Sequence, residues 1–401
     1  MFRRVVLIVL DGVGCGALPD AAAYGDAAAG AAANTLGHVA DAVGGLVLPC
    51  LQRLGLGNIL PLRGVAPVAR PQASWGRMAE RSAGKDSTTG HWEMAGVIQT
   101  QPFVTYPQGF PPEILALFER EAGCPALGNV AASGTSILGR LGAEHLRSGR
   151  PIVYTSTDSV FQIAAHEQIW PLERLYDLCR RLRPQLDRYR IGRIIARPFV
   201  GSVAEGFRRT EGRHDYSMAP PPMLLDALQQ ADVPVLAVGK IFDLFCGRGI
   251  SAHWPTAGNA DGMARTAAVF ATMERGLLFT NLIDFDMLYG HRNDAAGFAA
   301  ALQAFDQFLE GFLPSLTADD LLLVTADHGC DPTWPGTDHC REYVPLLVCG
   351  GAGQPAVALG DRASFADIGA TLAANFGVTA LAGDSFLAAL TSLGQQMRQR
   401  A

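Results

Sequence analysis

The sequence lacks several features that mark other classes of protein. It has no Cys-x-x-Cys motif, and its eight cysteines lie far apart in a chain of 401 residues, which can bury a core without disulfide bonds. We therefore expect reduced thiols and a cytoplasmic location. The apolar run at residues 5–10 ends after six residues at Asp11, too short for the core of a signal peptide or for a membrane span. We expect this run to be a buried strand and the protein to have no membrane partner.

Charge is also scarce. Only 17% of the residues are charged, the net charge is −6, and no basic stripe is present, so a nucleic-acid partner is not expected. An acidic protein repels phosphorylated molecules, so any phosphate-binding site must contain its own cations. The 49% of hydrophobic residues exclude a disordered chain.

Seven short apolar runs predict β-strands. Runs of this length, separated by helix-sized segments such as 223–230, 262–275 and 297–312, favour parallel strands covered by helices on both faces. The alanine-rich stretch 17–33 lacks this periodicity and is expected to be a loop. The predicted fold class is therefore α/β, with a mostly parallel sheet. The seven runs are 5–10, 151–155, 191–196, 233–239, 277–283, 321–326 and 344–350.

Residues 101–218 differ in composition from the rest of the chain. They contain several prolines near their beginning, two of the strand candidates and a group of arginines, and they end at the stiff proline stretch MAPPPM (218–223). We interpret this segment as an inserted, smaller domain, and residues 1–100 and 219–401 as the core. The arginines are Arg193, Arg197, Arg208, Arg209 and Arg213.

Acidic residues directly follow three of the predicted strands. Because the carboxyl ends of strands hold the active site in open α/β sheets, we expect these residues at one edge of the sheet. Together with nearby histidines they could bind two divalent ions through mixed oxygen and nitrogen ligands, which suit Mn²⁺ or Zn²⁺ better than Mg²⁺ or Ca²⁺. The candidates are Asp11, Asp284 or Asp286, His291, Asp327, His328 and His339.

Each of these residues has a simpler explanation when it is taken alone. An aspartate after a strand often caps the next helix, and a lone histidine is often only a hydrogen-bonded core or surface residue. Asp284 and Asp286 are two positions apart and would point the same way along a strand, so spacing does not choose between them. The joint occurrence of these residues at three strand ends is what favours a metal site.

Several blocks of sequence resemble the bacterial phosphopentomutases, a family of the alkaline phosphatase superfamily. They run from near the first residue to beyond residue 380, and the most specific are GKDSTTGHWE and DFDMLYGHRND. The resemblance implies an alkaline-phosphatase-like core with an inserted cap domain, and two Mn²⁺ ions. By position, it implies that Asp11, Asp327 and His328 bind one ion. The other ion would be bound by Asp286, His291 and His339.

The stretch KDSTTGHWE (85–93) is not a P-loop. That motif needs glycine where Ala79 stands, and serine or threonine where Asp86 follows the lysine. The resemblance places a nucleophile at Ser87, a position where threonine is frequent, and either hydroxyl can be activated by a metal. Spacing alone leaves Thr88 and Thr89 open as well. The alternative is a turn whose hydroxyls bond to its own backbone.

The resemblance also implies an activity, the interconversion of ribose or deoxyribose 1-phosphate and 5-phosphate. The path would use a phosphoenzyme on Ser87 and a pentose 1,5-bisphosphate, primed by glucose 1,6-bisphosphate or ribose 1,5-bisphosphate, under a lid that excludes water. Arg193, Arg208 and Lys240 are the implied clamp for the distal phosphate. Asp158 is the implied contact to the sugar hydroxyls.

Two other interpretations remain at this point. One is another metal-dependent phosphotransferase or phosphomonoesterase of the same superfamily. The other is a metal-binding or sugar-phosphate-sensing protein without catalysis, which would need a broken ligand set. A monomer is the simplest expectation, and the choice between ribose and deoxyribose is not predicted.

Overall fold

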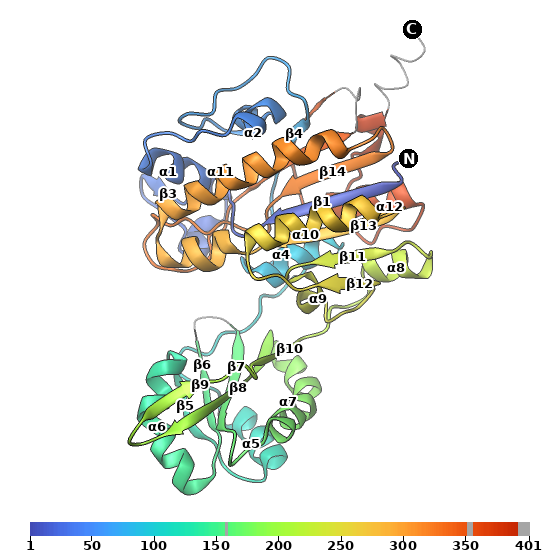
Figure 1. Ribbon diagram of the computed structural model, residues 1–401. Helices are drawn as coiled ribbons and strands as arrows, with labels where there is room; N and C mark the ends of the chain where they lie inside the picture. The colour runs from blue at the N-terminus through green and yellow to red at the C-terminus, as the bar shows by residue number, and fades with distance from the viewer. Residues whose placement is uncertain (157–158, 351–355, 392–401) are drawn as a thin grey trace. The chain divides into compact units, whose positions relative to one another are not determined.

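The computed structural model describes residues 1–156, 159–350 and 356–391, and the chain divides into two compact units (Figure 1). The larger unit comprises Met1–Gln101 and Pro220–Ala401, and the smaller comprises Pro102–Ala219. The smaller unit is thus an insertion into the larger one. Among the described residues, no helix is both long enough and apolar enough to cross a membrane.

The larger unit is built on an eight-stranded sheet. Seven strands run in one direction, and β15 runs antiparallel to both of its neighbours, β14 and β4. The strand order is β12-β11-β13-β1-β14-β15-β4-β16. In that order the strands span Ala252–Trp254, Val235–Val238, Gly276–Leu282, Arg4–Leu10, Asp320–Thr325, Val344–Gly350, Ser74–Met78 and Ala358–Arg362.

Helices cover both faces of this sheet, as Figure 1 shows. The long helices α10 (Asn259–Thr272) and α11 (Ala295–Phe312) pack together on one face, where α1 (Thr35–Ala42) and α2 (Pro49–Leu54) contact α11. The helices of the other face are α4 (Ser87–Met94), α8 (Leu224–Gln230), α9 (Ile241–Leu244) and α12 (Ala366–Phe376).

Burial explains why the central strands read as continuous apolar runs. β13 and β14 are buried along their whole length, and β1 is buried after its first residue, because helices cover the sheet on both sides. The predicted α/β class with a mostly parallel sheet is confirmed. The parallel orientation expected for residues 344–350 is wrong, because residues 326–343 contain no crossover helix and the chain turns straight back into β15.

The alanine-rich stretch 17–33 is mostly loop, as expected. It contains only the short 3₁₀ turn η1 (Ala21–Tyr24) and two strands of two residues each, β2 (Ala27–Ala28) and β3 (Ala31–Ala32). Another short helix, α3 (Leu56–Ile59), lies against β4.

The smaller unit has its own sheet, in the order β10-β8-β7-β6-β5, with β9 paired to β8. Apolar clusters lie on both faces of the sheet, one including Phe161 and Ile194 and the other including Tyr154 and Phe199. This unit is therefore also α/β. Its strands are β5 (Leu127–Ala131), β6 (Ile152–Thr155), β7 (Val160–His166), β8 (Arg193–Ser202), β9 (Gly206–Arg209) and β10 (His214–Ser217). Its helices are α5 (Pro112–Ala122), α6 (Gly134–Ser148) and α7 (Leu172–Leu186).

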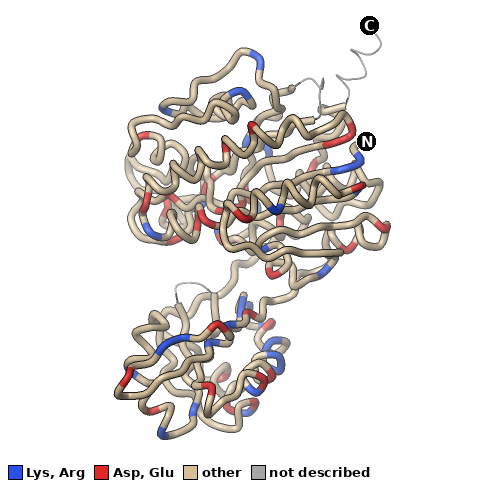
Figure 2. The backbone as a smooth tube through the Cα atoms, viewed as in Figure 1, with Lys and Arg blue, Asp and Glu red and all other residues tan. Residues whose placement is uncertain are grey.

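Charges of both signs are interspersed along both units (Figure 2). No single-sign stripe is visible in this view of the described residues, in keeping with the composition.

Candidate metal centre and active site

Three neighbouring strands deliver the candidate ligands to one edge of the sheet. β13, β1 and β14 are adjacent and parallel, so that Val9 pairs with Asn281 on one side and with Thr325 on the other. The residues that follow these strands therefore meet at the carboxyl edge.

The first group consists of Asp11, Asp327 and His328, all of which are buried. One oxygen or nitrogen atom from each of the three lies within 4.8 Å of the others. His328 Nε2 is 3.3 Å from Asp11 Oδ1 and 3.5 Å from Asp327 Oδ2. The backbone N–H of Gly12 donates to Asp327 Oδ1 at 3.0 Å, which fixes that carboxylate and leaves its other oxygen facing the group.

The second group is centred on Asp286. Its Oδ2 lies 3.3 Å from His291 Nε2, and its Oδ1 lies 3.3 Å from His339 Nε2. His291 Nδ1 is 2.7 Å from the carbonyl oxygen of Thr337, a contact that places the hydrogen on Nδ1 and leaves Nε2 able to bind a metal. The His339 and His328 rings are 4.2 Å apart between centroids, so the two groups adjoin.

The structure separates Asp284 from Asp286, which spacing alone could not do. Asp284 Oδ2 accepts the backbone N–H of Asn259 at 2.6 Å, and its own N–H donates to Asn259 Oδ1, so Asp284 anchors the start of α10. The expectation that both aspartates point the same way is wrong. The strand ends at Leu282 and the chain enters a π-helical turn at Phe285–Tyr289, which breaks the strand alternation.

Two buried carboxylate oxygens that accept no hydrogen bond fit a cation at this edge. Among the described residues, Asp286 Oδ1 and Asp327 Oδ2 are buried and accept no hydrogen bond. Burying such atoms is costly unless a cation or a donor compensates for the lost water. Carboxylates and imidazoles together suit a divalent transition metal.

The ionisable groups of the centre perturb one another. Burial alone would raise the pKa of Asp11, but the ammonium of Lys240 and the imidazole of His328 outweigh it and lower that pKa. Burial works against the charged form of His328, yet the carboxylates of Asp327 and Asp11 raise its pKa well above the ordinary value. Such perturbed groups at a strand edge are typical of functional sites.

Ser87 is the first residue of α4 and faces the first group. Its Oγ donates to Asp11 Oδ1 at 3.2 Å and lies 3.2 Å from His328 Nε2. Asp86 is the N-cap, and its carboxylate accepts the Thr89 N–H at 3.1 Å and the Thr89 hydroxyl at 2.6 Å. The hydroxyl of Thr89 is therefore engaged in capping, whereas that of Ser87 is directed at the candidate ligands.

The predicted substrate contacts are divided between the two units. Lys240 belongs to the larger unit, and its Nζ lies 3.7 Å from Asp11 Oδ2. Arg193 begins β8 of the smaller unit and lies 3.5 Å from Asp215. Arg208 is exposed on β9, where it pairs with Val200, seven residues along β8 from Arg193. At about 3.3 Å per residue, the Cα atoms of the two arginines are roughly 23 Å apart, so the two side chains do not form one clamp. Asp158 lies outside the described residues.

Residues that the sequence did not reveal fix the turn before Ser87. The buried guanidinium of Arg341 donates to Glu80 Oε2 at 2.8 Å and to the carbonyl oxygens of Ser82 and Gly84 at 2.7 Å. Arg341 follows His339 by two residues, so it ties the turn before Ser87 to the segment that contains the candidate ligand His339. The only signal in the sequence was its place in the block GTDHCREY.

The sequence patterns did not identify Cys330 as a candidate ligand either. Its Sγ lies 3.8 Å from His291 Nδ1, and it forms a possible ligand set with Asp286 and His291. Its position directly after Asp-His-Gly was the available signal.

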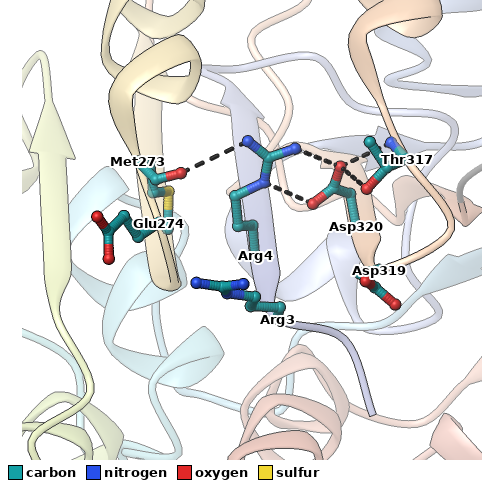
Figure 3. A pocket seen from close by; sticks show the side chains of 7 residues that line it. All are labelled: Arg3, Arg4, Met273, Glu274, Thr317, Asp319 and Asp320. Atoms are coloured by element: carbon teal, nitrogen blue, oxygen red, sulfur yellow. Dashed lines mark hydrogen bonds and ion pairs between the residues drawn. The ribbon is translucent and has the colours of Figure 1, made fainter.

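A separate pocket of about 260 Å³ opens at the other end of the sheet, around the start of β1 (Figure 3). Arg4 forms two hydrogen bonds of 2.6 Å with Asp320 there, and Asp320 also accepts from Thr317. These charges satisfy one another and join the beginnings of β1 and β14, which indicates a structural role. The lining residues are Arg3, Arg4, Met273, Glu274, Thr317, Asp319 and Asp320.

Comparison with known proteins identifies the family. A family model described as the metalloenzyme superfamily matches residues 247–380. The chain is 58% identical over 387 residues to a phosphopentomutase of Syntrophotalea carbinolica, covering 96% of this chain and 98% of that protein. It is 57% identical over 393 residues to a phosphopentomutase of Anaeromyxobacter sp. (strain K), covering 98% and 100%. The chain belongs to the phosphopentomutase family.

The resemblance to the phosphopentomutase family in the sequence is thus confirmed. Membership of the metalloenzyme superfamily implies dependence on a divalent metal. A solved phosphoglycerate mutase of Leishmania mexicana is also similar in structure, with a TM-score of 0.46 and 12% sequence identity, covering 95% of this chain and 96% of that chain.

Proposed function

We propose that the chain interconverts ribose or deoxyribose 1-phosphate and 5-phosphate through a phosphorylated Ser87. The observation that carries the proposal is the position of Ser87 Oγ, 3.2 Å from both Asp11 Oδ1 and His328 Nε2 at the beginning of a helix. The family supports the substrate class, because its curated members compared above are named phosphopentomutases.

We assign one Mn²⁺ ion to Asp11, Asp327 and His328, and a second to Asp286, His291 and His339. When bound, two such ions lower the pKa of the serine hydroxyl and offset charge on a phosphoryl group. The mixed ligands, their short mutual distances and the two buried oxygens that accept no hydrogen bond, Asp286 Oδ1 and Asp327 Oδ2, support this assignment.

In the proposed cycle, Ser87 Oγ attacks one phosphorus of a bisphosphate primer, the P–O bond to the sugar oxygen breaks, and the proton that Ser87 loses is balanced by the one that the leaving sugar oxygen takes up to become a hydroxyl. The phosphoserine next donates its phosphoryl group to the free hydroxyl of a pentose monophosphate, which gives the pentose 1,5-bisphosphate. The other phosphate of this intermediate then returns to Ser87, and the isomeric monophosphate leaves. No phosphate is lost in a full turn, and the primer is glucose 1,6-bisphosphate or ribose 1,5-bisphosphate.

Two features of the larger unit favour an anion beside Ser87. The N-terminus of α4 presents backbone N–H groups and the positive end of the helix dipole. The ammonium of Lys240 adds a full positive charge next to Asp11. We therefore assign Lys240 to the phosphate that reacts, instead of to the distal phosphate.

We assign the smaller unit the role of a cap that keeps water from the phosphoserine. Arg193 is its proposed contact to the distal phosphate and Asp158 its proposed contact to the sugar hydroxyls. Arg208 is not part of the proposed phosphate contact, because its pairing with Val200 lies seven residues along β8 from Arg193.

A monomer is the simplest proposed assembly. The six buried cysteines of the described residues form no disulfide bonds, which supports a cytoplasmic location.

Phosphorus NMR tests the function directly. The purified chain is incubated with Mn²⁺, ribose 1-phosphate and a trace of glucose 1,6-bisphosphate, with the Ser87→Ala variant as the control. We expect ribose 5-phosphate with little inorganic phosphate, and no conversion by the variant. Inorganic phosphate as the main product would instead establish a phosphomonoesterase at the same centre.

A further inference from the structure

His91 lies on α4, four residues after Ser87, and is completely buried. Its ring stacks on Phe279 of β13, with 5.8 Å between centroids. Asn281 follows Phe279 by two positions on the same face of that strand and is buried as well. Neither His91 nor Asn281 belongs to the proposed ligand set, so their burial beside it needs an explanation.

The contacts of His91 define which ring nitrogen carries the hydrogen. Nδ1 lies 2.8 Å from the backbone carbonyl oxygen of Ser87 and 3.2 Å from Asp327 Oδ2. Both neighbours are acceptors, so Nδ1 carries the hydrogen and donates it to the Ser87 carbonyl. Nε2 is then an acceptor, and the amide nitrogen of Asn281 lies 3.4 Å from it.

The orientation of Asn281 follows from its other contact. Its Nδ2 donates to Asp11 Oδ2 at 3.1 Å, and a flipped amide would set its oxygen against that carboxylate. One amide hydrogen therefore serves Asp11, and the other is directed towards His91. The two side chains form a continuous link from Asp11 to the backbone of Ser87, beside Asp327.

We propose that His91 and Asn281 are a positioning pair that holds Ser87 in register with the carboxylates of Asp11 and Asp327. The inference rests on the proposed function, in which Ser87 and these carboxylates act together. Partners that orient metal ligands in this way change metal affinity or activity by about 10- to 100-fold when they are removed. The pair is buried, so bulk water cannot readily replace the lost donors.

The packing of α4 supports this role. A Cβ atom at Gly90 would lie only 2.2 Å from the backbone oxygen of Asp327, so the helix touches the ligand-bearing segment directly. Dense packing transmits small shifts, and a displaced His91 would therefore move Ser87 relative to Asp327.

Two substitutions of similar size, made in the full-length chain, test the contacts of His91 Nδ1 and Nε2 separately. The amide nitrogen of His91→Asn can take the place of Nδ1 and keep the bond to the Ser87 carbonyl. The amide nitrogen of His91→Gln lies nearer to the position of Nε2, so this variant loses that bond. For His91→Gln we expect kcat with ribose 1-phosphate to fall about 10- to 100-fold and the Kd for Mn²⁺, measured by EPR, to rise by a similar factor. We expect KM to change little and His91→Asn to stay closer to the wild type.

A matched control is available in the smaller unit. His145 is also completely buried on a helix, its Nδ1 lies 2.7 Å from the carbonyl oxygen of Arg150, and its Nε2 accepts the His166 N–H at 2.9 Å. His145→Gln should lower thermal stability without changing the Kd for Mn²⁺ or kcat.

Three outcomes decide the proposal. It is overturned if a folded His91→Gln variant keeps wild-type kcat and Mn²⁺ affinity, or behaves like His145→Gln. If neither His91 variant folds, the Asn281→Ala variant is used for the test. Wild-type Mn²⁺ affinity in that variant would also overturn the proposal. If the wild-type chain itself fails to bind two Mn²⁺ ions or to convert ribose 1-phosphate, the proposed function is what fails.

Discussion

At the scale of single residues, hydrogen bonding distinguishes the hydroxyl of Ser87 from that of Thr89. The Thr89 hydroxyl donates to the N-cap Asp86 and accepts from Gln99, so it stabilises the beginning of α4. Ser87 Oγ instead faces Asp11 and His328. The sequence contained three adjacent hydroxyls, and only the helical geometry of α4 determines which one reaches the candidate ligands.

Removing the Ser87 hydroxyl should abolish mutase activity. Loss of a covalent nucleophile lowers kcat by about 10⁴-fold or more, so Ser87→Ala should be inactive in a coupled assay with ribose 1-phosphate. Ser87→Thr should keep substantial activity because it retains a hydroxyl. Thr88→Ala, a hydroxyl deletion one residue away, should resemble the wild type; a loss there equal to that of Ser87→Ala would contradict the assignment.

Arg193 and Arg208 form a matched pair of arginines in the smaller unit. Arg193→Ala should raise KM for ribose 1-phosphate about tenfold or more, since a charge-assisted bond to a phosphate contributes about 1.5–3 kcal/mol. Hydrolysis of a small aryl phosphate, which has no distal phosphate, should change much less. Arg208→Ala should affect neither reaction. Equal losses for both substrates in Arg193→Ala would exclude its role at the distal phosphate.

At the scale of helices and strands, the central strands of the larger sheet were the predictable ones. β1, β13 and β14 carry continuous apolar runs because both faces of the sheet are covered, and the predicted bounds agree with the structure to within about a residue. β4 (Ser74–Met78) alternates buried and half-buried residues near one edge of the sheet and was missed. The direction of β15 depends on the long loop before it, which no local pattern encodes.

Gly90 allows a prediction about how closely α4 packs against the segment that contains Asp327. Gly90→Ala places a Cβ 2.2 Å from the Asp327 backbone oxygen and should force α4 away from β14, at a cost of about 1–3 kcal/mol in the free energy of unfolding. The kcat of the Gly90→Ala variant should also fall, because Ser87 moves with the helix.

Gly139→Ala in α6 is the control. Its Cβ meets no atom within 4 Å, so it should stabilise the chain by about 0.5–1 kcal/mol without changing kcat. Thermal melting and steady-state kinetics measure both effects, and unchanged activity in a folded Gly90→Ala variant would contradict this account of the packing.

At the scale of the whole molecule, the candidate metal ligands come from segments up to about 330 residues apart in the chain. Their common edge was predictable because parallel strands end together. The contact of Asp284 with Asn259, the bonds from Arg341 to the turn before Ser87, and the link from Asn281 to His91 were not predictable. These contacts depend on how loops pack after the sheet has formed, and no spacing in the sequence records them.

The stability of the chain should depend on pH in opposite ways with and without metal. The pKa values of His328 and His291 are raised in the folded, metal-free chain, although burial opposes the charge of both: Asp327 and Asp11 act on His328, and Asp286 on His291. A raised histidine pKa stabilises the fold below the unfolded value, about 6.5, and that contribution is lost as pH rises through the folded pKa. The metal-free chain should therefore lose thermal stability as the pH rises above about 6.5.

Mn²⁺ should reverse this trend, because it binds neutral imidazoles and its affinity rises with pH. At a free Mn²⁺ concentration of 100 Kd the stabilisation amounts to about 2.7 kcal/mol. Melting curves with EDTA and with Mn²⁺ across this pH range measure the gap between the two states. A gap that stays constant with pH would contradict the assignment of the histidines as ligands.

The most direct test of the proposed phosphoenzyme is to find the phosphoryl group on Ser87. The Mn²⁺-loaded chain is mixed with glucose 1,6-bisphosphate, quenched and digested, and the peptide that contains residues 85–93 is sequenced by mass spectrometry. We expect one phosphoryl group, on Ser87, which disappears when ribose 5-phosphate is added before the quench. Phosphate on Thr88 or Thr89, or an unmodified peptide from a chain that still interconverts the pentose phosphates, would contradict this expectation.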